Sequence, residues 1–141
     1  MIELLVEQIA ADTRLSPEQA RMALAGSLAI LRNHGDPAKV DALMQALPGA
    51  DDLAKEGAAV AGKAGLMGGL LRFAGGAQGA AAADALAMGN YLKKQDVKAA
   101  DLRQMLPIAR KWARKQTGSE VLDEAMMSIP GVAAMMAPKQ A

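Results

Sequence analysis

The sequence of 141 residues predicts an all-α protein, folded as a single domain of six to eight helices over residues 1–141. Apolar residues make up 52% of the chain and aromatic residues only 2%, so alanine, leucine and methionine dominate, and these favour helices over strands. Apolar side chains also recur at helical spacing in several segments. Finally, residues 40–49 align with residues 122–131, and the same offset pairs Leu4 with Leu86. A match at one fixed offset indicates an internal structural repeat.

The repeat predicts two three-helix units that are related by a pseudo-twofold axis. Repeat 1 spans residues 1–50 and repeat 2 spans residues 83–131, with a Gly/Ala-rich helical middle at 51–82 and a loose tail at 132–141. A unit of about 50 residues is only marginally stable alone, because it buries too little surface. We therefore expect the two units to pack on each other through their long helices.

The first helix is expected over residues 2–12, where apolar side chains follow helical spacing. Residues 16–19 read Ser-Pro-Glu-Gln, which is a helix start with a serine cap, a proline in the first turn and a glutamine that closes a capping box. The second, long helix should therefore span about 17–33. Gly35 is expected to end it in the left-handed conformation.

The remaining helix boundaries of both copies follow from similar signals. Asp-Pro at 36–37 should begin the third helix, and Pro-Gly at 48–49 should end it. In the second copy, Gly118 should stop the long helix, and Ser119 should cap the short helix that follows.

The second copy has weaker boundary signals than the first. Its first helix is expected over 83–94 and its long helix over 99–116. Lys98 stands where the first copy has its serine cap, so the cap should be poorer, although Asp101 favours the positive end of the helix dipole. Pro107 falls inside the long helix and is expected to kink or split it, because proline removes one backbone hydrogen bond.

Four short stretches form a recognisable pattern: Leu-Ser-Pro-Glu-Gln-Ala at 15–20, Ala-Leu-Pro-Gly-Ala at 46–50, Gly-Leu-Met-Gly-Gly-Leu at 65–70 and Met-Leu-Pro at 105–107. Together they resemble the VcgC/VcgE-type family of small bacterial proteins. The likeness covers most of the chain. Lys98 and the alanine-rich middle depart from the family pattern. Because the family has no assigned activity, the resemblance implies a fold and no catalytic residues.

Few side chains suit catalysis or metal binding. There is no cysteine, and His34 is the only histidine, expected at the end of the second helix where it favours the negative helix terminus. Asp-Asp at 51–52 and Asp-Glu at 123–124 are expected to be solvated acids at helix N-termini. The glycines at 57–62 precede a lysine, but Ala64 stands where a phosphate loop needs serine or threonine. We therefore predict no enzyme, no cofactor and no metal site.

The one candidate binding face is basic. Residues 93–115 hold eight lysines and arginines against two aspartates. The default interpretation is a solvated charged face, and the alternative is a surface that binds nucleic acid or an acidic protein. Trp112 falls on the apolar stripe, so it is expected to anchor the core rather than stack on bases. The candidate residues are Lys94, Arg103, Arg110, Lys111, Arg114 and Lys115.

These observations favour a non-enzymatic protein that binds a protein partner or self-associates. The first alternative is nucleic-acid or acidic-surface binding through the basic face of residues 93–115. The second is peripheral membrane association through the Gly/Ala/Leu middle, without a transmembrane span, because its longest uncharged run covers 11 residues at 73–83. No small-molecule substrate is evident. The acidic start of the chain does not resemble a signal peptide, and a cytoplasmic location is expected.

Overall fold

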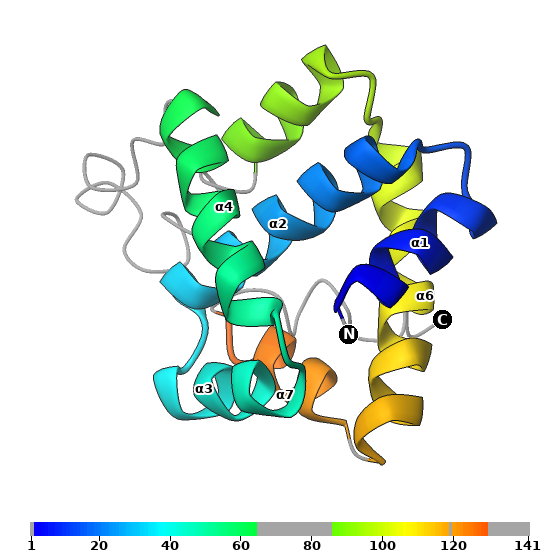
Figure 1. Ribbon diagram of the computed structural model, residues 1–141. Helices are drawn as coiled ribbons and strands as arrows, with labels where there is room; N and C mark the ends of the chain where they lie inside the picture. Colours follow the sequence, from blue (N-terminus) through cyan, green and yellow to red (C-terminus); the bar gives the residue numbers. More distant parts are fainter. Residues whose placement is uncertain (1, 65–85, 119, 130–141) are drawn as a thin grey trace, which may run out of the picture.

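The computed structural model describes residues 2–64, 86–118 and 120–129, and these residues form seven helices and no strand (Figure 1). The all-α prediction is thereby confirmed. One helix spans residues 86–94. The other helices are α1 (Ile2–Asp12), α2 (Pro17–His34), α3 (Pro37–Ala46), α4 (Ala50–Ala64), α6 (Ala99–Thr117) and α7 (Val121–Met127).

Helix α2 lies at the centre of the fold, and helices from both predicted repeats pack around it (Figure 1). Helix α4 crosses α2 and is its most extensive neighbour, whereas α1 contacts both α2 and α6, and α7 packs on α3 and α6 (Figure 1). One cluster of buried apolar side chains draws on all seven helices, from Ile2 and Leu5 of α1 to Ala125 of α7. The start of the predicted middle is helix α4. Residues 65–82 of that middle, and the tail predicted at 132–141, lie outside the described residues.

The prediction that the two long helices pack directly on each other is wrong. Helices α2 and α6 approach at their N-terminal ends, where the Gln19 side-chain amide donates at 3.1 Å to the carbonyl of Gln95, in the turn that precedes α6 (Figure 1). From there they separate, and α4, which crosses α2, is the main neighbour of α2 in place of α6 (Figure 1).

Small residues explain the preference of α2 for α4. A Cβ added at Gly57 of α4 would lie only 1.8 Å from the Ala25 carbonyl oxygen of α2, so only glycine permits this approach. Arg21 of α2 also forms a bidentate ion pair with Glu56 of α4, with Nη2 at 2.6 Å and Nε at 3.1 Å from the two carboxylate oxygens. These hydrogen bonds raise the pKa of Arg21. The close backbone contact and the ion pair fix α4 on α2.

The helix ends of the first copy follow the predicted caps with one exception. The Gln19 N–H donates to the Ser16 hydroxyl at 3.1 Å, and the Ser16 N–H donates to the Gln19 side chain at 2.9 Å, which completes the capping box. Gly35, however, is not left-handed. Its φ is −79°, in the extended region, because α3 begins two residues later and the chain passes directly into it.

The second copy also keeps most of its predicted boundaries. Lys98 makes no side-chain cap, and Gly118 ends α6, both as predicted. Gly118 adopts the left-handed conformation there, with φ of 67°. Helix α6 is not split at Pro107 but continues to Thr117, because proline removes only one of its backbone hydrogen bonds. Ser119 lies outside the described residues, and Glu120 stands at the N-cap of α7 without a side-chain cap.

Candidate functional site

The predicted basic face divides into two groups, and the first is occupied by ion pairs within the protein. The Arg110 Nε lies 2.5 Å from one carboxylate oxygen of Asp123, and the Arg114 Nη2 lies 3.0 Å from the other. Arg114 also lies 3.4 Å from Glu120. Because Asp123 is in the first turn of α7, these pairs join α7 to α6 and neutralise both guanidinium groups.

Asp123 corrects one prediction about the paired acids. It was expected to be solvated, yet its side chain is only 15% exposed and lies between two arginines of another helix. Its neighbour Glu124 is exposed, as predicted. Asp51 and Asp52 do lie in the first turn of α4, where Asp51 pairs with Arg32 of α2.

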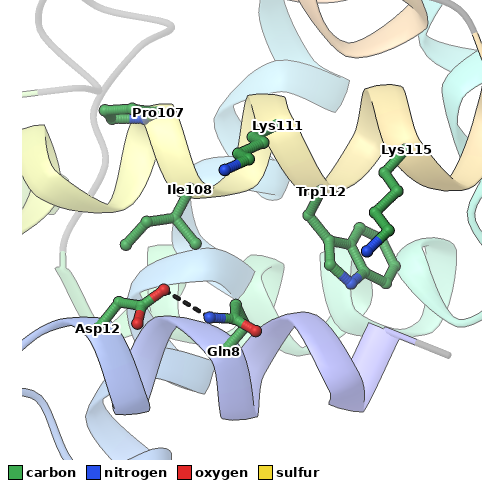
Figure 2. A pocket seen from close by; sticks show the side chains of 7 residues that line it. All are labelled: Gln8, Asp12, Pro107, Ile108, Lys111, Trp112 and Lys115. Atoms are coloured by element: carbon green, nitrogen blue, oxygen red, sulfur yellow. Dashed lines mark hydrogen bonds between the residues drawn. The ribbon is translucent and has the colours of Figure 1, made fainter.

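The second group of basic residues faces a groove between α1 and α6 (Figure 2). Within the described part of the chain, neither Lys111 nor Lys115 takes part in an ion pair, and the two side chains lie one helical turn apart on α6. The volume of this groove is about 420 Å³. We call it the α1–α6 groove, and its lining residues are Gln8, Asp12, Pro107, Ile108, Lys111, Trp112 and Lys115.

The groove combines an apolar surface with charges of both signs. Ile108 and Trp112 project from α6 toward α1, and both are half-buried against the core (Figure 2). Trp112 therefore packs against the core, as predicted, but also lines a surface groove. Opposite it, the Gln8 side-chain amide donates to the Asp12 carboxylate at 2.5 Å. The groove thus offers two ammonium groups beside one carboxylate that is already hydrogen-bonded.

The structure does not bring the whole predicted face together. Arg103 and Lys94 are exposed, but they belong neither to the α1–α6 groove nor to the ion-paired group. Sequence reasoning also missed Gln8, Asp12 and the roles of Pro107 and Ile108. No local signal in the sequence could have found Gln8 and Asp12, because their place beside α6 depends on contacts between distant segments.

Other features of the described residues can be stated briefly. His34 lies in the last turn of α2, as expected. Residues 2–64, 86–118 and 120–129 contain no group of three histidine or acidic side chains arranged to hold a metal ion. Over the same residues, no helix combines the length and the apolar character that a membrane-spanning helix requires.

The chain was compared with family models, curated proteins and solved structures. A family model described as "Protein of unknown function VcgC/VcgE" matches residues 1–130. Comparisons with curated proteins and with solved structures give no match.

Proposed function

The chain belongs to the VcgC/VcgE family, whose function is unknown, and we propose that it is a protein-binding module. Its α1–α6 groove would receive an acidic helical segment of a partner protein. The observation that carries the proposal is the pair formed by Lys111 and Lys115, which flank Trp112 and have no ion-pair partner among the described residues. The proposal assigns no reaction and no cofactor.

The spacing of the two lysines defines the complementary partner. Residues four apart lie on one face of a helix, so Lys111 and Lys115 suit two carboxylates that are also one helical turn apart. Trp112 and Ile108 would accept a large apolar side chain between those carboxylates. Buried tryptophan is a frequent anchor of protein interfaces, and flanking charges contribute mainly to specificity and association rate.

The intrinsic fluorescence of Trp112 provides a direct test, because it is the only tryptophan in the chain. The probe is a helix-stabilised peptide with two glutamates four residues apart and a leucine between them. We expect the peptide to change the Trp112 emission saturably. Replacing both glutamates with lysine should weaken binding at least about tenfold, since the like charges would then repel.

A pair of matched double variants locates the binding surface. Lys111→Glu with Lys115→Glu should weaken peptide binding at least about tenfold, whereas Lys93→Glu with Lys94→Glu, which makes the same change in net charge, should leave it within about twofold. Equal effects of the two double variants, or no saturable emission change in the wild type, would contradict the proposal. Light scattering distinguishes a partner protein from a second copy of this chain.

Nucleic-acid binding through residues 93–115 receives less support from the same geometry. Arg110 and Arg114 are paired with Asp123, so fewer cations remain for phosphates. Phosphate contacts make affinity fall steeply with salt. Tight binding of a DNA duplex with such a salt dependence, lost in the Lys111→Glu and Lys115→Glu double variant, would favour this alternative.

Membrane association through the middle concerns mainly residues outside the described ranges, and sedimentation with anionic vesicles tests it.

We also propose that the two units are related by a pseudo-twofold axis. An offset of 82 carries the bounds of α2 onto 99–116, against an observed α6 of Ala99–Thr117, and carries α1 onto 84–94, against the helix at 86–94. In each unit the first helix packs on the long helix of the other unit: α1 packs on α6, and Met88 of the helix at 86–94 packs on Gly26 of α2. An experimental structure in which residues 4–47 and 86–129 fail to superpose would exclude the axis.

A further inference from the structure

An apolar cavity lies in the core between α1, α2, α6 and α7, and the proposed protein-binding groove does not include it. Its volume is about 220 Å³. Thirteen of its fourteen described lining residues are apolar, among them Leu24 and Leu28 of α2 and Leu102 and Leu106 of α6. The only polar one is Ser27, and no charged side chain is among them.

The cavity is open to solvent at one end, but nine of its described lining residues are buried and belong to the core. Core side chains normally pack without gaps larger than a water molecule. An apolar cavity of about 150 Å³ stays dry and binds benzene, and this cavity is about half as large again. A stable internal water needs two to four polar partners, and the described lining supplies one hydroxyl. The cavity is therefore suited to an apolar molecule rather than to water.

Ser27 determines which polar group such a molecule can carry. Its hydroxyl donates to the Ala23 carbonyl, with 2.8 Å between the oxygens, so its proton is already used. The Ser27 oxygen retains lone pairs that can accept a hydrogen bond. A ligand hydroxyl or N–H group can donate to it, whereas a carboxylate cannot. Ser27 is also exposed while Leu24 and Leu28 are buried, which puts the polar end of the cavity at its opening.

We propose that this cavity binds a small neutral molecule, an aliphatic chain or ring that carries one hydrogen-bond donor. The apolar part lies among the leucines, and the donor bonds the Ser27 oxygen at the opening. A charged head group is disfavoured because none of the described lining residues offers an opposite charge.

Three probes with eight carbons each test separately whether binding needs the hydrogen-bond donor and whether it excludes a charge. 1-Octanol carries a donor, 1-methoxyheptane has the same atoms but no donor, and octanoate at pH 8 carries a charge. Titrations of the full chain, followed by amide chemical shifts, should show saturable binding of octanol. Its affinity should exceed that of the ether by about fivefold, which corresponds to one net hydrogen bond, and that of octanoate by more.

Two variants test the placement of the ligand. Ser27→Ala should abolish the preference for octanol over the ether while leaving ether binding intact. Ala109→Leu, which fills the cavity from α6, should remove binding of both probes, and Ala109→Val is a milder replacement if the larger one does not fold. The proposal is overturned if the wild type binds no octanol saturably, if octanoate binds as well as octanol, or if filling the cavity leaves binding unchanged.

Discussion

Arg14, in the loop between α1 and α2, donates to the buried carboxylate of Asp101 in the first turn of α6, with 2.6 Å between the atoms. The same carboxylate oxygen accepts the Lys98 N–H at 2.9 Å. Arg14 also donates to the Asp96 carbonyl at 2.9 Å. This network connects the first copy to the start of the long helix of the second, at the point where α2 and α6 come closest.

The hydrogen bond that Arg14 donates to Asp101 raises the pKa of Arg14 above its ordinary value. When an arginine pKa is raised on folding, the stabilising contribution of its charge is fully present below the ordinary arginine pKa and is lost only when the pH rises through the still higher pKa of the folded state. The guanidinium is therefore charged wherever the protein is folded, and the pair is best tested by mutation of its acid rather than by alkaline titration.

We expect Asp101→Asn to lower the free energy of unfolding by about 1–2 kcal/mol, because it replaces a charge-assisted hydrogen bond of a buried carboxylate with a neutral one. The measurement is urea unfolding followed by circular dichroism. Asp96→Asn is the matched control: its side chain is 70% exposed and lies 3.5 Å from Arg14, so its loss should cost less than about 0.5 kcal/mol. Asparagine also tolerates the positive φ of 64° at this position. Equal losses from the two variants would show that the burial of Asp101 does not strengthen the pair.

Gly57→Ala should destabilise the protein by about 2–3 kcal/mol, because the new Cβ meets backbone atoms of Ala25 that cannot move without shifting α2. Gly89→Ala is its matched control. No atom lies within 4 Å of a Cβ at Gly89, in the helix at 86–94, so alanine should stabilise that helix by about 0.5–1 kcal/mol. Thermal unfolding should show a lower melting temperature for Gly57→Ala and a higher one for Gly89→Ala. A stabilised Gly57→Ala protein would contradict the close packing of α2 and α4.

Asp123→Asn should release Arg110 and Arg114 from the ion pairs that join α6 to α7. We expect a loss of about 1 kcal/mol in unfolding free energy, because the aspartate is mostly buried and hydrogen-bonded to charged groups. The freed arginines should also increase retention on a heparin column. Glu124→Gln makes the same change in net charge at an exposed neighbour, so it should elute close to the wild type. Equal shifts for both variants would mean that retention follows net charge alone.

The features that the sequence predicted correctly are local. The Ser16 capping box, the Asp36 cap and the end of α6 at Gly118 each depend on residues within one helical turn, and each appears in the structure. Gly35 was predicted wrongly because its conformation depends on where the next helix begins as well as on glycine's freedom.

The candidate site was predicted only in part because the charges of α6 meet partners on other helices, which the sequence of α6 alone does not reveal. Arg110 and Lys111 are adjacent basic residues whose side chains leave α6 about 100° apart, but the sequence does not show which of the two meets an acidic partner. The structure separates them because α7 places Asp123 beside Arg110, whereas α1 and its groove lie beside Lys111. Which helix lies on which face of α6 is decided by packing of segments far apart in the chain.

Pro107→Ala should stabilise α6, since the new N–H can donate to the Arg103 carbonyl within an unbroken helix. Proline in a helix interior costs up to about 3 kcal/mol relative to alanine, so we expect a gain of about 1–3 kcal/mol, measured by urea unfolding. Pro37→Ala is the control at the first position of α3, where no helical hydrogen bond is missing, and it should change stability by less than about 1 kcal/mol. Pro107 also lines the α1–α6 groove, so a loss of stability in Pro107→Ala would indicate that its ring packs against α1 more favourably than the missing hydrogen bond costs.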